Sequence, residues 1–199
     1  MIIDNKGIQT AKFYLPPFQL NYGEIAIIRL KNNLESVVIE KVLTQLLSEK
    51  NIDKDIISTE KFSIADYKKD SLISKIFYKN NVKNYLKRNA NLKSPFASKI
   101  YEIDWIKPNT LLNRLPGTPK KQLYIYCTLS KTKYLIFNLN GLDNQGRNET
   151  FQMVKKYIKE LNGAAIILDC FEELETICDI YIELEYHLDE GKQVNFLQK

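Results

Sequence analysis

The fold is decided by residues 134–169, YLIFNLNGLDNQGRNETFQMVKKYIKELNGAAIILD. This stretch begins with an apolar run, Tyr134 to Leu139, and ends with a second one, Ala164 to Asp169, and both runs have the length of a buried strand. Between them, apolar residues recur at helical spacing: Phe151, Val154, Ile158 and Leu161. A strand, a helix and a strand in succession are typical of a βαβ unit, which predicts a parallel sheet covered on both faces.

Residues before this unit predict further strands and a helix. Residues 8–20 and 25–30 read as two extended segments joined by a turn at 21–23, a hairpin that leads into a buried strand. A helix of about fifteen residues should follow Asn33, its expected N-cap, because the apolar spacing changes there. Its apolar positions are Leu34, Val37, Val38, Val42, Leu46 and Leu47.

The remaining segments complete the predicted architecture. We expect short strands within 52–64, weakly patterned helix within 66–94, a helix from Pro119 to Ser130, a short helix over 172–178 and a third strand over 180–184. The predicted core comprises Ile25 to Ile28, Val38, Val42, Leu135, Phe137, Ile166 and Leu168.

Composition limits the class of protein. The chain has 199 residues, of which 44% are hydrophobic and 27% charged, and this balance indicates one globular domain and excludes disordered and collagen-like chains. The three cysteines have no zinc-ligand spacing, so we expect reduced thiols and no metal. The first residues lack the apolar core of a signal peptide, and we therefore expect a cytoplasmic protein.

Charge is distributed unevenly along the chain. Residues 66–99 contain nine Lys or Arg and two Asp, a local balance of +7, whereas residues 161–190 contain nine Asp or Glu and no Lys or Arg, a balance of −9. Such segregation is compatible with two solvated faces, with complementary docking, or with an anionic partner for the basic segment.

Four segments, taken in order, resemble the ATPase domain of ABC transporters. Residues 13–43 resemble that family's antiparallel hairpin, first parallel strand and following helix, and residues 115–122 resemble its signature segment. Residues 134–143 resemble the Walker B strand with the D-loop, and residues 165–179 resemble the switch strand and its helix. The resemblance implies one domain over 1–199, an α/β, three-layer, P-loop NTPase-like fold with an N-terminal antiparallel β-element and a small helical subdomain at about 66–112.

The residues that the family uses on ATP are missing from this pattern. A P-loop needs glycines, a Lys and a hydroxyl around the phosphates, but Ser36 stands at the Lys position of a loop without glycine. The Walker B carboxylates are matched by Asn138 and Leu139, the signature Ser by Pro116, and the switch His by Asp169. The resemblance therefore implies a domain that binds no cofactor and does not hydrolyse ATP.

Other parts of the pattern are retained. Gly117 in the signature bend and the D-loop residues Gly141, Leu142 and Asp143 face a second protomer in the family, so we expect them at a partner interface. The alternative is that Gly141 to Asp143 form an ordinary turn before a helix that starts near Asp143.

The sequence thus favours an inactive ABC-type domain that acts as a structural or regulatory subunit. Its expected partner is an active ABC ATPase, a permease or a second copy, and a permease would bring it to the inner membrane as a peripheral subunit. The alternative is a nucleic-acid- or ribosome-binding protein, because the basic segment contains Tyr67, Phe77, Tyr78, Tyr85 and Phe96, which could stack on bases. An unrelated enzyme that uses the acidic cluster Glu172, Glu173 and Glu175 is a third hypothesis.

Overall fold

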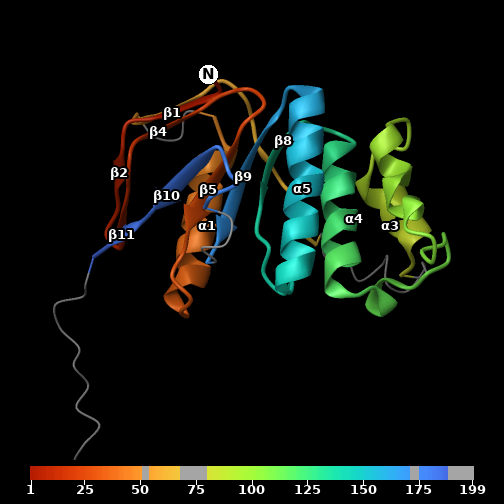
Figure 1. Ribbon diagram of the computed structural model, residues 1–199. Helices are drawn as coiled ribbons and strands as arrows, with labels where there is room; N and C mark the ends of the chain where they lie inside the picture. The colour runs from red at the N-terminus through yellow and green to blue at the C-terminus, as the bar shows by residue number, and fades with distance from the viewer. Residues whose placement is uncertain (51–53, 68–79, 171–174, 188–199) are drawn as a thin grey trace, which may run out of the picture.

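The computed structural model describes residues 1–50, 54–67, 80–170 and 175–187. Its centre is a five-stranded parallel sheet with the strand order β10-β5-β9-β8-β7 (Figure 1). The strands are β5 (Ile25–Arg29), β7 (Ser63–Ile64), β8 (Tyr134–Phe137), β9 (Ala164–Asp169) and β10 (Ile180–Glu183). Tyr134 pairs with Ala164, so the two apolar runs that decide the fold are neighbouring parallel strands, as predicted.

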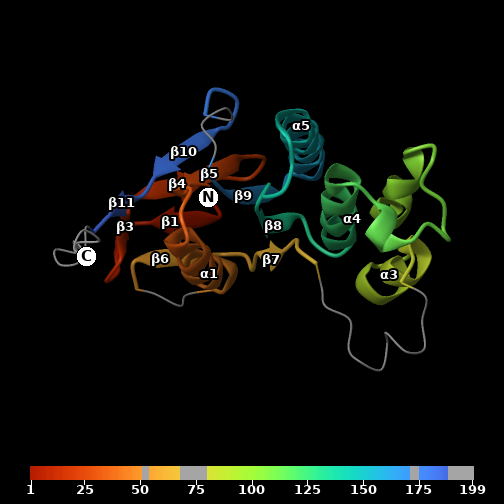
Figure 2. The same ribbon diagram turned by 90° about the horizontal axis from the view of Figure 1, so that it is seen from below.

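The two faces of this sheet are covered by different layers. Leu135 and Phe137 point to one face, where α4 (Gly117–Leu129) and α5 (Asn144–Leu161) pack. Tyr134 and Ile136 point to the other, where α1 (Glu35–Ser48) and the antiparallel strands pack. Figure 2 shows α1 and α5 on opposite sides of the sheet. The alternation of side chains along each strand therefore produces two cores and three layers, as predicted.

Antiparallel strands form two smaller sheets, β4-β1-β6 and β11-β3-β2. Their members are β1 (Ile3–Asn5), β2 (Ile8–Gln9), β3 (Phe13–Leu15), β4 (Phe18–Leu20), β6 (Ile56–Ser58) and β11 (Glu185–Tyr186). The predicted hairpin between residues 8–20 and 25–30 is wrong, because β5 pairs with β9 and β10 and not with β4. Pro16 and Pro17 separate β3 from β4, and because proline cannot donate to a ladder the two strands join different sheets.

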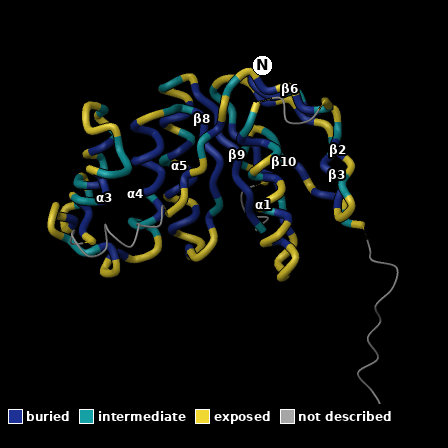
Figure 3. Tube along the Cα trace, turned by 180° about the vertical axis from the view of Figure 1, so that it is seen from behind, coloured by how far each residue is buried: buried dark blue, intermediate teal, exposed yellow. Residues whose placement is uncertain are grey.

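Helix α1 buries a different face from the one predicted. Ile39, Leu43 and Leu47, spaced four residues apart, are at most 1% exposed and pack against the parallel sheet. Val38 is 47% exposed and Val42 is 38% exposed, so their placement in the core is wrong. The helix has two apolar stripes, and periodicity alone does not say which one packs. The other predicted core residues are buried, and Figure 3 shows β8 and β9 as buried strands at the centre.

Residues between β7 and α4 contain short helices. They are α3 (Val82–Asn89) and the 3-10 helices η1 (Pro95–Glu102) and η2 (Leu112–Arg114). Residues 68–79, which belong to the expected helical subdomain, lie outside the described residues, and so do residues 171–174 of the helix expected over 172–178. The described part of that last segment is turn and bend. No helix in the described part of the chain is both long enough and apolar enough to cross a membrane.

Candidate functional site

The loop between β5 and α1, residues 30–34, is the segment in which the sequence resemblance places a P-loop. The Ser36 hydroxyl donates to the Lys31 carbonyl, and the Ser36 amide donates to the Asn33 side chain at 3.0 Å. The N-cap position of α1 is Leu34, so the predicted N-cap at Asn33 is wrong by one residue, although the Asn33 side chain does accept from the first turn of the helix. The Leu30 amide donates to the Asp169 carbonyl at 2.7 Å. These amides and the hydroxyl are therefore already bonded, partly within the loop and the first turn of α1 and partly to the end of β9, and in this sense the loop is closed.

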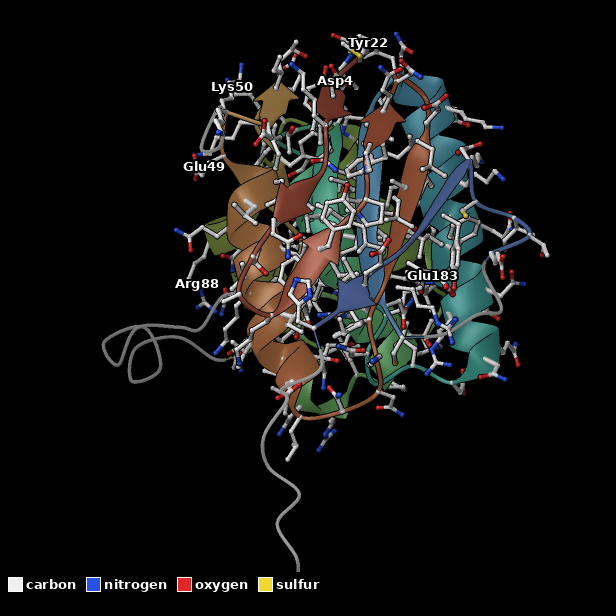
Figure 4. The ribbon with its side chains drawn as sticks, turned by 90° about the vertical axis from the view of Figure 1, so that its left-hand side faces the viewer. Asp4, Tyr22, Glu49, Lys50, Arg88 and Glu183 are labelled. Atoms are coloured by element: carbon white, nitrogen blue, oxygen red, sulfur yellow. The ribbon has the colours of Figure 1, made fainter. Side chains whose placement is uncertain are left out.

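Tyr186 on β11 holds the same loop from outside. Its hydroxyl accepts a hydrogen bond from the Lys31 amide at 2.7 Å, and the Lys31 ammonium lies 4.3 Å from the centre of its ring, a cation–π contact. Burial raises the pKa of Tyr186, so the phenol stays protonated at neutral pH. The ion pair between Arg29 and Glu183, at 2.5 Å, lies beside this contact and joins β5 to β10 (Glu183 is labelled in Figure 4).

Asn138, at the Walker B aspartate position, follows β8 and lies in a hydrogen-bonded chain. Its Oδ1 accepts from Lys121 Nζ at 2.8 Å, and its Nδ2 donates to Glu40 Oε1 at 2.5 Å. Lys121 belongs to α4 and is only 8% exposed, and burial lowers the pKa of its side chain. Glu40 belongs to α1.

The two other residues at catalytic positions are internal. Leu139 is 0% exposed and belongs to the core against α4 and α5. Asp169 is 1% exposed at the end of β9, and its Oδ1 accepts a hydrogen bond from the Cys170 amide at 2.7 Å. Leu139 is thus closed off from solvent, and Asp169 offers a carboxylate acceptor where the resemblance implies a histidine.

The signature segment and the D-loop lie against each other. Pro116 stands at the N-cap position of α4, and a Cβ atom on Gly117 would come within 2.9 Å of the Gly141 carbonyl. Leu142 is 5% exposed and lies against Gly117, so most of its side chain packs inside the chain, and its contact with a partner stays a prediction. Asp143 accepts from the Gly146 amide at 2.7 Å and caps α5, which is the alternative that the sequence allowed.

A hollow of about 520 Å³ opens beside this contact. Its lining combines the signature and D-loop glycines with two lysines and two tyrosines, namely Gly117, Gly141, Lys120, Lys121, Tyr67 and Tyr124. The prediction that Gly117, Gly141 and Asp143 contact a partner stays a prediction. The structure brings Gly117 and Gly141 to one surface region, to which Lys120 adds positive charge.

The structure offers no metal centre in the part of the chain that it describes: no group of three or more His, Cys, Asp or Glu side chains is placed to hold an ion. His187 is exposed, next to the side chain of Gln9 on β2.

Solved structures with the same arrangement are ABC proteins. CbiO1 of Clostridium perfringens, part of the ABC transporter complex CbiONQ, aligns with a TM-score of 0.64 and 18% identity over 94% of this chain and 87% of its own. An ABC-transporter-type ATP-binding protein from Pyrococcus furiosus aligns with a TM-score of 0.64 and 13% identity, over 92% of this chain and 97% of its own. This chain has the ABC ATPase fold. A further ABC transporter ATP-binding subunit aligns with a TM-score of 0.57 and 12% identity, over 93% of this chain and 86% of its own.

Comparisons of the sequence alone add nothing to this result, since no family model and no curated protein matches the chain. At these identities the structural likeness establishes the ABC ATPase fold, and the function has to be argued from the site itself.

Sequence reasoning missed three residues of this site. Tyr186, Lys121 and Glu40 form the contacts just described, yet their partners lie 155, 17 and 98 positions away along the chain. No local pattern connects positions so far apart. The sequence did contain one indication for Lys121, which lies both in the signature segment at 115–122 and on the helix predicted from Pro119 to Ser130.

Proposed function

We propose that this chain is a catalytically inactive domain of the ABC ATPase fold that acts as a structural or regulatory subunit of a transporter or a related complex. The observation that carries the proposal is the closed loop between β5 and α1. A P-loop binds phosphate because its backbone amides point outward at the anion. In this chain the Lys31 and Ser36 amides are bonded to Tyr186 and Asn33, and the Ser36 hydroxyl is bonded to the Lys31 carbonyl.

Magnesium-ATP does not fit the residues that surround this loop. Glu35, at the start of α1, would place a carboxylate near the phosphates, which are themselves anionic. Asn138 offers an amide oxygen that already accepts from Lys121, instead of the carboxylate that magnesium prefers. Pro116 has neither a hydroxyl nor a backbone N–H to donate to a phosphate. We therefore derive no step of a reaction through ATP in this chain.

The outer face of α1 supports a role in a complex. Leu34 is 92% exposed, and Val37, Val38 and Val42 on the same face are between 38% and 55% exposed. Contiguous apolar residues on the surface of a soluble domain typically mark an interaction site. We assign this face to another subunit of the complex, an active ABC ATPase or a permease, since the structural neighbour CbiO1 is itself part of a transporter complex.

The alternative of nucleic-acid binding receives less support from the basic segment. Tyr85 is 1% exposed, and the ring of Phe96 packs at right angles to Tyr157, with centres 5.0 Å apart. Tyr67 contacts Tyr85 and Tyr124 with its ring. Tyr85 is therefore closed to bases, and Phe96 and Tyr67 are already in contact with other rings of the chain, although Tyr67 remains 37% exposed. Phe77 and Tyr78 lie outside the described residues.

Two measurements test this proposal. Isothermal titration calorimetry with magnesium-ATP should give no binding heat for this chain, whereas an intact ABC ATPase domain titrated in parallel should bind. Purification of the tagged chain from its native host should recover an ABC ATPase or a permease, and the Val37→Asp/Val38→Asp double variant should recover less of it. Saturable ATP binding would contradict the proposal. So would a purification in which neither the wild type nor the double variant recovers a partner.

A further inference from the structure

Three elements of the fold meet at one hydrogen-bonded chain at the carboxyl edge of the parallel sheet. Lys121 comes from α4, Asn138 follows β8 and Glu40 comes from α1. The Lys121 ammonium donates to Asn138 Oδ1 at 2.8 Å, and Asn138 Nδ2 donates to Glu40 Oε1 at 2.5 Å. The Asn140 amide also donates to Asn138 Oδ1, at 3.2 Å.

The side chain in the middle of this chain has to be an amide. A carboxamide presents an acceptor on one side and a donor on the other, so it can lie between a cation and an anion and satisfy both. An aspartate at this position would satisfy Lys121 but would set a second carboxylate against Glu40 at hydrogen-bond distance, where like charges repel. The geometry thus explains why asparagine stands where an ATPase of this fold has its aspartate.

The cation in this chain is buried and is surrounded by acidic groups. Lys121 is 8% exposed, and the carboxylates of Asp66, Glu40 and Asp169 all stabilise its charged form, against the cost of burial. A buried charge is tolerated only when it is paired or hydrogen-bonded. We propose that the Lys121 ammonium is the resident cation of this site, which compensates the carboxylates at the edge of the sheet so that the domain needs neither metal nor nucleotide there.

This inference rests on the proposed function, because it assumes that no magnesium-ATP competes for the same edge. It goes beyond that function because it gives the site a structural role: the hydrogen bonds of Lys121 and Asn138 hold α4, the end of β8 and α1 in a fixed arrangement. Lys121 is thus a positioning residue and not a catalytic one.

An exchange of charges tests the proposal. The variant Asn138→Asp restores the family's acidic residue and should nevertheless lower the melting temperature by about 5 °C or more, because its carboxylate faces Glu40. Adding Glu40→Gln to it exchanges amide and carboxylate, so that a donor again faces an acceptor at each contact, and should recover most of that loss. Asn140→Asp, two residues further along and exposed, is the matched control and should leave the melting temperature within about 1 °C of wild type.

A second pair of variants tests the ammonium itself. Lys121→Met keeps most of the length of the side chain but removes its hydrogen bond to Asn138 together with the charge, and it should lower the melting temperature, whereas Lys120→Met on the same helix should not. If Asn138→Asp/Glu40→Gln is no more stable than Asn138→Asp, or if the two lysine variants behave alike, the resident-cation proposal is overturned. These measurements contain no nucleotide, so their failure is distinct from the ATP binding that would overturn the proposed function.

Discussion

At the scale of single residues, the polar groups of Ser36 and Asn138 are already hydrogen-bonded to other groups of the chain. The Ser36 hydroxyl and amide are both engaged within the loop, by Lys31 and Asn33, and this supports our proposal that the loop binds no phosphate. Asn138 is engaged on both sides by Lys121 and Glu40. A ligand that entered this edge would have to displace these bonds and leave buried polar groups unpaired, which typically costs about 1–3 kcal/mol for each group.

The titration of Lys121 provides a prediction at this scale. Burial lowers the pKa of Lys121 below 10.5 in the folded chain, and Asp66, Glu40 and Asp169 oppose the shift. Between the folded and unfolded pKa values the unfolded chain binds more protons, so this group makes the protein more stable as the pH rises through that window. Below the window the cost of burying the charge is fully present.

We therefore expect the stability of the wild type, measured relative to Lys121→Met, to increase as the pH rises toward the unfolded-state value of 10.5. Urea unfolding of both proteins across this range is the measurement, because all other titrating groups are common to the two and cancel in the difference. A difference that stays constant or falls with pH would show that the lysine is not desolvated as the structure places it.

At the scale of elements, the backbone between α5 and β9 lies close to the backbone of Lys133, just before β8, and this contact determines which residues can join α5 to β9. Asn162 ends α5 in the left-handed conformation, with φ of 50°, and Gly163 follows it directly before β9. The Ala164 amide donates to the Lys133 carbonyl at 3.0 Å. A Cβ atom on Gly163 would lie 2.2 Å from that same carbonyl oxygen, a distance that no backbone can accommodate without moving.

Gly163→Ala should therefore destabilise the domain by about 3 kcal/mol, at the upper end of the cost of overpacking, because the conflict is with main chain. Thermal unfolding followed by circular dichroism should show a melting temperature lower by about 6–12 °C. Asn162→Gly, one residue earlier, is the control: glycine adopts the positive φ at no steric cost, so little change is expected there. A Gly163→Ala protein with the wild-type melting temperature would contradict this account of the junction.

The elements themselves could be predicted from sequence to a large extent. The apolar runs at Tyr134 and Ala164 and the helical stripe between them give β8, β9 and α5 directly, because such runs have few alternatives once they must be buried. The partners of the strands could not be predicted: β3 and β4 are close in sequence and join different sheets. The buried face of α1 was predicted wrongly, since Val38 and Ile39 are equally apolar and only the packed sheet distinguishes them.

The same limit applies to the site. Ser36, Asn138 and Asp169, which the resemblance singled out, lie near the carboxyl ends of β5, β8 and β9, which the strand order makes neighbours. The resemblance could not supply Tyr186 or Lys121, since these residues act through contacts between elements that are distant in the chain.

At the scale of the whole molecule, the framework is independent of the site. The two cores lie on opposite faces of the parallel sheet and are built from apolar side chains of the strands, α1, α4 and α5. Burial of this kind is the main source of stability in folded domains and requires no ligand. We expect such a framework to keep its shape without a bound nucleotide, so that the surfaces of α1 and of the signature segment remain open to a partner.

The last prediction is that this chain does not hydrolyse ATP and that Ser36→Lys will not restore hydrolysis. Phosphate binding, magnesium coordination, orientation of water and closure by a second protomer act in one transition state, so losses among them are not additive. The new lysine would follow a loop without glycine whose Lys31 amide is held by Tyr186. Leu139 would still lie in the core, and Asn138 would still be bonded to Lys121 and Glu40. Phosphate release should stay at background for both proteins while an intact ABC ATPase domain turns over in the same assay. Turnover that follows the purified wild type and is lost in Asn138→Ala or Asp169→Ala would instead reveal an active site that uses these residues.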